Sequence, residues 1–272
     1  MRPAAILQNA LLGASALLIA GAHFAPDRDH TGPVLNAAVA LVRGTPDTSA
    51  AVTADSTGTA GALAGITRSA IATLSGAVRP LSRPEALESA FRSYFAFKAA
   101  HPDEVRKPFL YFVDYGLPAT AKRGYVFDME HLRVVDGPFT VAHGRGSAAK
   151  DGVPTRFSNA SGSNATSLGL YVAKSIYDFR GKSAGRKYSS LGLRLMGVST
   201  GFNDRALARG VVAHGAPYVT ESKAGRSEGC PAMEPERAER LLPKLADGGM
   251  VFLFAPDQRW LSTDPWVTGS AG

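Results

Sequence analysis

The sequence predicts a mainly β domain with flanking helices, an α+β fold, behind a long segment of low complexity. Short runs of aromatic and β-branched residues, separated by Gly and Pro, are typical of strands. Two longer segments repeat their apolar residues at helical spacing. Residues 31–80 consist largely of Ala, Thr, Ser and Gly, which supply too little apolar surface for a core. Of the 272 residues, about 190 are left for one well-formed core.

The N-terminus has the features of a secretory signal. Arg2 precedes the short apolar run Ala10–Ala20, and Ala20-Gly21-Ala22 supplies small residues for cleavage. The run is shorter than the roughly 20 residues that span a bilayer, so we expect a cleaved signal, with an uncleaved anchor as the alternative. This predicts export to the periplasm or cell envelope, with membrane contact only during passage through the membrane.

These features predict four consecutive regions. We expect a signal peptide at 1–22, a low-complexity spacer at 23–83, a folded domain at 84–262 and a flexible tail at 263–272. Within the spacer, Leu63–Val78 is a candidate for a weak helix.

The predicted domain begins with a helix over 84–100. Pro84 suits a first helical turn, Leu87, Phe91 and Phe95 share one face, and His101-Pro102 ends the helix because a residue before proline avoids the α region. Three apolar runs then predict an antiparallel meander, with turns at 116–118 and 136–138. They cover 109–115, 125–135 and 139–142.

The second half of the domain begins with a polar segment, 144–169, which we predict to be a long irregular binding loop. Later apolar runs predict further strands, at 168–176, 192–198 and 210–213. Met233–Ala246 places Ala238, Leu241 and Leu245 on one face and predicts a helix, kinked or shortened by Pro243. Met250–Phe254 predicts a buried closing strand.

The chain is basic, with a formal net charge of +7 and an isoelectric point near 9.6. The basic residues are scattered and no motif of interleaved aromatic and basic residues occurs, so nucleic acid is not an expected partner. For an exported protein, an anionic polymer of the envelope is the better candidate. We expect a monomer.

The single cysteine, Cys230, is the strongest functional signal. An exported protein with one cysteine has no internal disulfide, so this thiol is buried, bridges two chains or reacts. Gly229 directly precedes it and a strand ending in His214-Gly215 lies upstream, which favours the reactive thiol, since a nearby imidazole is the commonest way to generate a thiolate.

A cysteine nucleophile requires a base and donors for an oxyanion. Val-Ala-His-Gly occurs twice, ending in His143-Gly144 and His214-Gly215, and we assign the base to His214 because it is closer in sequence. A carbonyl at Gly215 or nearby is the expected acceptor for its other ring nitrogen. Gly229 and Cys230 are the expected oxyanion donors, assisted by the dipole of the following helix. Arg226 is either a surface charge or a group that lowers the thiol pKa or binds a substrate carboxylate.

Together these residues resemble the murein L,D-transpeptidase catalytic domain family. The resemblance covers about residues 85–256 in order. The motifs that carry it are His143-Gly144-Arg145-Gly146-Ser147, Phe157-Ser158-Asn159, Ser167-Leu168-Gly169, Asn203-Asp204-Arg205-Ala206-Leu207-Ala208-Arg209, His214-Gly215-Ala216-Pro217-Tyr218 and Gly225-Arg226-Ser227-Glu228-Gly229-Cys230-Pro231-Ala232.

The resemblance implies a β-sandwich or barrel in which a thiolate attacks the peptidoglycan stem peptide. Attack at the L-centre of meso-diaminopimelate expels D-Ala, and an amine of a second stem takes the acyl group to form a 3-3 cross-link. Neither a cofactor nor a metal is implied. The mapping makes Cys230 the nucleophile and His214 the base. The residues then expected to line the cleft are Ser227, Arg226, Tyr218, His143 and Asn159.

Two positions depart from the family pattern. Glu228 stands where the family usually has His or an aromatic residue, and a carboxylate facing the thiol would raise its pKa, so we expect Glu228 to point to solvent. Pro231-Ala232 replaces the Arg that follows the cysteine in better-known members, which leaves Arg226 as the candidate for binding a carboxylate.

Three alternatives stay open at this stage. An L,D-carboxypeptidase would use the same thioester and pass the acyl group to water. A non-catalytic wall-binding protein would keep the fold, although both His214 and Cys230 are present. A metal hydrolase using His143, His214 and Cys230 lacks the closely spaced His or Cys pairs typical of such sites.

Overall fold

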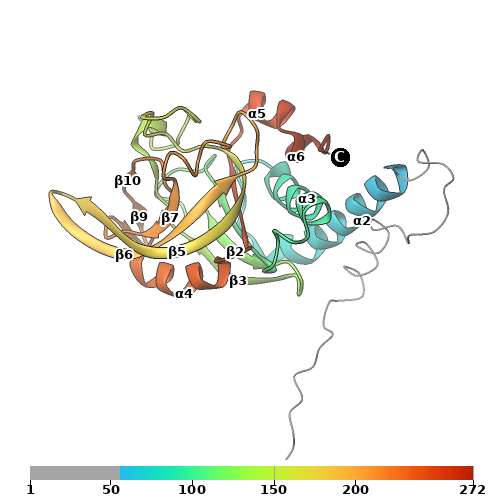
Figure 1. Cartoon of the computed structure of the whole chain (residues 1–272), viewed down its shortest axis with the longest axis horizontal. Coiled ribbons are helices and arrows are strands. Elements are labelled where there is room, and N and C mark those ends of the chain that lie inside the picture. Colours follow the sequence, from blue (N-terminus) through green and yellow to red (C-terminus); the bar gives the residue numbers. More distant parts are fainter. Residues whose placement is uncertain (1–55, 150, 272) are drawn as a thin grey trace, which may run out of the picture. The chain divides into compact units, whose positions relative to one another are not determined.

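A computed structural model describes residues 56–149 and 151–271 (Figure 1). The predicted signal peptide and the predicted spacer up to residue 55 lie outside the described residues. The helices are α2 (Ser56–Leu74), η1 (Ser75–Ala77), α3 (Glu85–Ala100), η2 (Arg145–Ser147), α4 (Pro235–Leu245), α5 (Gln258–Thr263) and α6 (Pro265–Thr268). The strands are β1 (Phe109–Asp114), β2 (Gly124–Asp128), β3 (Arg133–Phe139), β4 (His143–Gly144), β5 (Gly169–Ser183), β6 (Arg186–Gly197), β7 (Val212–Gly215), β8 (Val219–Thr220), β9 (Lys223–Ala224), β10 (Arg226–Ser227), β11 (Ala232–Met233) and β12 (Met250–Phe254).

Eight strands form one mixed sheet in the order β11-β7-β6-β5-β12-β1-β2-β3. Neighbours are antiparallel except for two parallel pairs, β12 with β1 and β11 with β7. The strand pairs β10-β4 and β8-β9 form two small additional sheets. The α+β class predicted from the sequence is confirmed. Every predicted strand region contributes to the main sheet, although 139–142 does so only through Phe139, the last residue of β3.

The meander β1-β2-β3 is antiparallel as predicted, but its second turn lies elsewhere. The predicted strand 125–135 is interrupted after Asp128, whose Oδ1 accepts the N–H groups of Glu130 at 3.2 Å and His131 at 3.1 Å. This side-chain capping competes with the strand ladder and turns the chain. β3 then continues through Pro138, which is tolerated there because β3 is the edge strand of the sheet.

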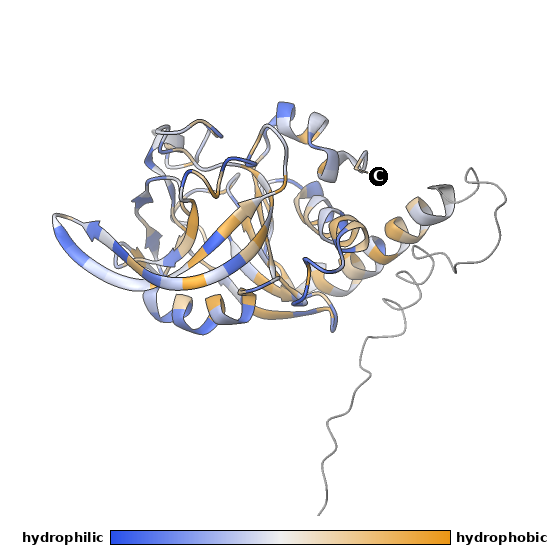
Figure 2. Cartoon of the chain, in the orientation of Figure 1, coloured by the Kyte–Doolittle hydropathy of each residue, from blue (hydrophilic) through white to orange (hydrophobic). Residues whose placement is uncertain are grey.

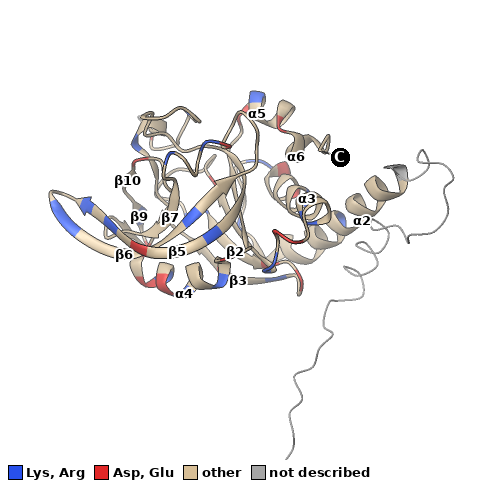
Figure 3. Cartoon of the chain, viewed as in Figure 1, with Lys and Arg blue, Asp and Glu red and all other residues tan. Residues whose placement is uncertain are grey.

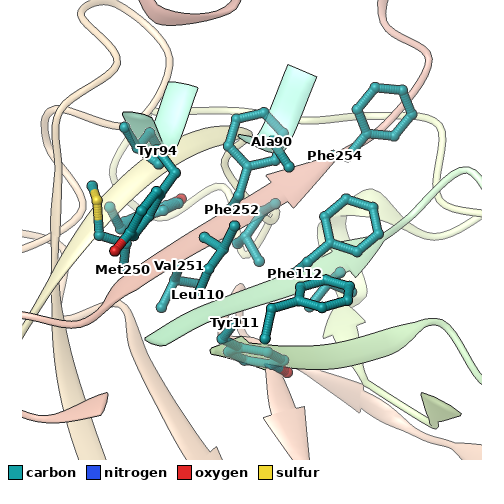
Figure 4. Close-up of a cluster of buried hydrophobic side chains, with 14 of the residues drawn as sticks. Ala90, Tyr94, Leu110, Tyr111, Phe112, Met250, Val251, Phe252 and Phe254 are labelled. Carbon is teal, nitrogen blue, oxygen red and sulfur yellow. The ribbon is translucent and has the colours of Figure 1, made fainter. Parts of the chain in front are cut away.

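The core lies where α3 packs against β1 and β12 (Figure 4). Every residue of β2 and β12 is buried, and the hydropathy view places apolar residues along α3 and the central strands (Figure 2). The ring of Phe91 on α3 meets Phe127 on β2 edge to face at 5.3 Å. The aromatic stripe predicted on this helix is therefore core packing, each ring contributing about 1.5–3 kcal/mol by burial.

β5 and β6 form a long hairpin that extends beyond the rest of the sheet, with basic residues at its tip (Figures 1 and 3). Tyr188 lies across from Gly181, and a Cβ at Gly181 would come within 2.5 Å of the Tyr188 ring. Tyr177 covers Gly192 in the same way, at 2.7 Å. Aromatic rings laid over cross-strand glycines give an otherwise polar hairpin apolar contacts of its own.

Both ends of the described chain pack on the domain. α2, within the predicted spacer, buries Ile66, Ala70 and Leu74 at intervals of four residues against α3. The segment predicted as a flexible tail contains α6, where Trp266 is 9% exposed and donates through Nε1 to Val198 O at 2.9 Å. In residues 56–149 and 151–271, no helix is both long and apolar enough to cross a bilayer.

Candidate active site

Parallel pairing of β7 with β11 brings the predicted base and nucleophile together. Ala232 lies opposite His214, and Met233 lies opposite Gly215. Cys230 precedes Ala232 by two residues and is therefore level with Val212, whose N–H donates to Cys230 Sγ at 3.5 Å. The thiol and the imidazole thus lie on adjoining segments of the sheet. In the register of these segments Cys230 is level with Val212, two residues before His214, and both side chains face one cleft.

The tautomer of His214 follows from a single hydrogen bond. Its Nδ1 lies 2.9 Å from the carbonyl oxygen of Gly215, the acceptor expected from the sequence. A carbonyl only accepts, so Nδ1 carries the proton and Nε2 of the neutral ring has a free lone pair. Phe179 stacks on the imidazole at 4.1 Å between ring centroids, which fixes the plane of the ring.

Burial keeps both groups neutral. It lowers the pKa of His214 to about 4, although the bond to Gly215 acts in the opposite direction. Burial also raises the pKa of the Cys230 thiol, while the Val212 N–H and the Arg209 guanidinium oppose that rise. At neutral pH the resting pair is therefore a thiol and a neutral imidazole.

Ser227 holds the turn that carries Cys230. Its Oγ–H donates to the Cys230 carbonyl at 2.6 Å, and the same oxygen accepts the Gly229 N–H at 3.2 Å. The Gly229 N–H, one of two predicted oxyanion donors, is thus engaged within the turn. The other, the Cys230 N–H, has no hydrogen-bond partner among the described residues.

Gly229 is required by both backbone conformation and space. Its φ is +122°, a region that residues with a side chain rarely adopt, and a Cβ there would lie 2.9 Å from the carbonyl oxygen of Ala165. Gly144 packs against the other side of the turn, since a Cβ on it would lie 2.8 Å from the Gly229 Cα.

An open cleft of about 1170 Å³ surrounds this turn. It collects five of the predicted site residues, namely Cys230, His214, Ser227, Arg226 and Tyr218. Glu228 also lies at the rim, with its side chain 77% exposed and 3.4 Å from Arg145, so it points to solvent as predicted.

Two predicted substrate-binding residues are not among the residues that line this cleft. His143 is fully buried behind it, and its Nδ1 accepts from Arg123 Nη2 at 2.9 Å. Burial, aided by the charge of Arg123, lowers the pKa of His143 to about 3. The Asn159 amide is engaged elsewhere: it donates to Asp204 Oδ1 at 2.6 Å and accepts the Arg205 N–H at 3.2 Å. These positions give both side chains structural contacts.

Among the cleft residues to which the sequence assigned no role, three lie next to the predicted base or to the turn that carries the thiol. Phe179 and Tyr188 form an aromatic wall beside His214. The alternation of Tyr177, Phe179 and Gly181 with charged residues was a strand signal that would have placed them on one face. Arg209 was part of a quoted motif but had no assigned role, because only the tertiary fold brings it to Cys230.

The family assignment rests on a model of the L,D-transpeptidase catalytic domain, which matches residues 80–254. The chain belongs to the L,D-transpeptidase catalytic domain family. The matched residues run from before the meander to the end of β12 and include every residue that lines the cleft. No curated protein matches the chain in sequence.

Solved L,D-transpeptidases are also similar to this family member. An L,D-transpeptidase from Mycobacterium smegmatis is 15% identical over 54% of this chain and 59% of its own, with a TM-score of 0.33. One from Mycobacterium tuberculosis H37Rv is 18% identical over 54% and 57%, with a TM-score of 0.32. One from Stackebrandtia nassauensis is 14% identical over 81% and 89%, with a TM-score of 0.34. The chain spans less than two thirds of the first two structures.

Proposed function

We propose that this chain is a peptidoglycan L,D-transpeptidase with Cys230 as nucleophile and His214 as base. One observation carries the proposal: the Gly215 carbonyl fixes His214 in the tautomer that accepts a proton, beside the chain's only thiol, in a member of this family. The substrate is a peptidoglycan stem ending in meso-diaminopimelate and D-Ala.

In the first step, Cys230 Sγ attacks the carbonyl carbon at the L-centre of meso-diaminopimelate. The thiol proton passes to His214 Nε2 as the S–C bond forms, because the two groups are neutral beforehand. The Cys230 N–H, which has no partner within the described residues, donates to the developing oxyanion. His214 then gives its proton to the departing amine, the C–N bond breaks and D-Ala leaves.

In the second step, an amine of another stem attacks the thioester. His214 takes a proton from the amine, a new C–N bond forms, and the S–C bond breaks with return of a proton to Cys230 Sγ. The product is a 3-3 cross-link. When water replaces the amine, the same chemistry yields a shortened stem, the carboxypeptidase outcome.

The deciding experiment incubates the full chain with purified tetrapeptide muropeptides and analyses the products by mass spectrometry. A cross-linked dimer lacking one D-Ala supports the transpeptidase, whereas tripeptide stems alone support the carboxypeptidase. Cys230→Ser should abolish turnover, and Arg205→Met, an exposed residue outside the cleft, is the matched control. Unchanged muropeptides with a confirmed free thiol contradict both activities.

No feature of the described residues specifically favours the wall-binding or the metal-hydrolase alternative. Within 56–149 and 151–271, no three His, Cys, Asp or Glu side chains are grouped so as to hold a metal ion. We further propose that the protein acts in the cell envelope after export. Fractionation of cells that express a tagged chain tests this, and retention in the cytoplasm refutes it.

A further inference from the structure

Arg209 ties down the loop that forms one wall of the cleft. Its Nη1 donates to Ser158 O at 2.9 Å and to Ser167 Oγ at 2.5 Å. Its Nη2 donates to Ala165 O at 3.0 Å and to Ser163 Oγ at 3.2 Å. The cleft is lined on this side by Ser161, Gly162 and Asn164. A single guanidinium therefore binds the irregular segment at Ser158, before these cleft residues, and at Ala165 and Ser167, after them.

The hydrogen bonds of Arg209 leave it unable to bind a substrate carboxylate through paired N–H groups. A guanidinium has five N–H groups, and four of them, all those on Nη1 and Nη2, are used by these acceptors. The planar end that forms paired bonds with a carboxylate is therefore occupied, so Arg209 is not a bidentate ligand for a substrate carboxylate. In the described part of the chain no acidic side chain forms an ion pair with it, so its charge is not neutralised.

The same guanidinium adjoins the nucleophile's turn. Nη2 lies 3.8 Å from the position that a Cβ on Gly229 would occupy, directly before Cys230. Arg226, which the sequence left as either a surface charge or a group acting on the thiol or a carboxylate, is exposed and has no hydrogen-bond partner for its side chain among the described residues. Arg209 is half-buried and held rigidly, so its charge has a fixed position next to the turn.

We propose that Arg209 is a positioning residue that places a fixed, uncompensated positive charge beside Cys230 and thereby favours its thiolate. The charge stabilises the negative sulfur as the proton leaves, without reorganisation during the reaction. Its contribution to turnover rests on the proposed transpeptidase function, but its effect on the thiol does not.

The surroundings of Cys230 identify which charges bear on the thiol. The positive charge of Arg209 lowers the Cys230 pKa, and the exposed Glu228 carboxylate raises it. His214 is neutral at neutral pH. The other titratable groups that interact with the thiol are tyrosines, Tyr115, Tyr171, Tyr177, Tyr188 and Tyr218, and these too are neutral because burial raises their pKa values. Arg145 and Arg226 line the same cleft from its exposed side.

The test uses the pH dependence of Cys230 alkylation by iodoacetamide, which reports on one site because the full chain has one cysteine. Arg209→Met should slow alkylation at pH 7 about tenfold and move the rate profile to higher pH, as loss of a nearby opposite charge does. Arg209→Lys keeps the charge and should keep most of the profile. Arg205→Met, four residues earlier in the same turn, where Arg205 O accepts the Arg209 N–H, should leave it unchanged.

A purely structural role gives a different pattern. If Arg209 only clamps the loop, Arg209→Lys and Arg209→Met should slow alkylation equally without moving the profile along the pH axis, which overturns the proposal. Ser167→Ala removes one clamp bond but no charge, and should leave the profile in place even if Arg209→Met fails to fold; a profile moved by Ser167→Ala also overturns it. Muropeptide turnover is measured in parallel, so absence of turnover with an Arg209-dependent profile counts against the transpeptidase alone.

Discussion

Burial of His214 in its neutral form predicts a specific loss of stability in acid. Unfolded, the imidazole binds a proton below its ordinary pKa of 6.5, whereas folded it does so only below about 4. Between these values the unfolded state binds more protons, so the free energy of unfolding decreases as the pH falls from about 6.5 to 4. His214 is 2% exposed, so solvent screens this effect little. At 1.36 kcal/mol per pKa unit, the loss between pH 7.5 and pH 4 is about 3 kcal/mol.

The assay is urea unfolding followed by tryptophan fluorescence at a series of pH values, for the natural chain and for His214→Phe. The variant keeps an aromatic ring against Phe179 but does not titrate, so contributions of other groups, including buried His143, cancel in the difference. The natural chain should lose about 3 kcal/mol more than the variant between pH 7.5 and pH 4. Two parallel stability curves would refute the neutral, buried imidazole on which the proposed base depends.

Three further predictions concern the turn and the C-terminal segment. Gly229→Ala should destabilise the protein by about 1–3 kcal/mol and reduce Cys230 alkylation, whereas Gly201→Ala, at φ +79° in open space, should cost only backbone strain; equal effects in urea unfolding contradict the close contact with Ala165. Ser227→Ala should cost about 1–2 kcal/mol of unfolding free energy and slow turnover, because it releases both ends of the turn. Trp266→Ala should cost about 3 kcal/mol, and an unchanged thermal midpoint would support the flexible tail predicted from the sequence instead.

The sequence predicted the site better where chemistry is local. Cys230, His214 and the Gly215 acceptor follow from residue types close together in the chain. The structure brings Cys230 and His214 to one cleft and places the Gly215 carbonyl on the His214 ring. Arg209 could not be found this way, because its position beside Gly229 depends on folding of the loop 158–167 around it. His143 shows the opposite error, since a repeated Val-Ala-His-Gly motif does not indicate whether its imidazole faces the cleft or the core.

The fold was predictable wherever apolar periodicity is strong. α3 begins one residue after the predicted start and ends where predicted, and β12 matches its prediction at both ends. The outer half of the β5-β6 hairpin, 177–191, was missed because aromatic rings packed over Gly181 and Gly192 stabilise it. Each of these contacts joins two strands, so the residue pattern of either strand alone does not predict it. Its two-residue turn places Ala184 at φ +49°, a conformation that the residue type does not suggest.

Because β7 and β11 pair in parallel, the position of Cys230 relative to His214 does not depend on the length of the turn between β8 and β9. The backbone pairing of β7 with β11, at Ala232 and Met233, positions His214 and Cys230, and the turn at Glu221-Ser222 takes no part in it. Residues can therefore be inserted, removed or exchanged near Glu221, at the exposed β8-β9 turn, without altering the offset of thiol from imidazole.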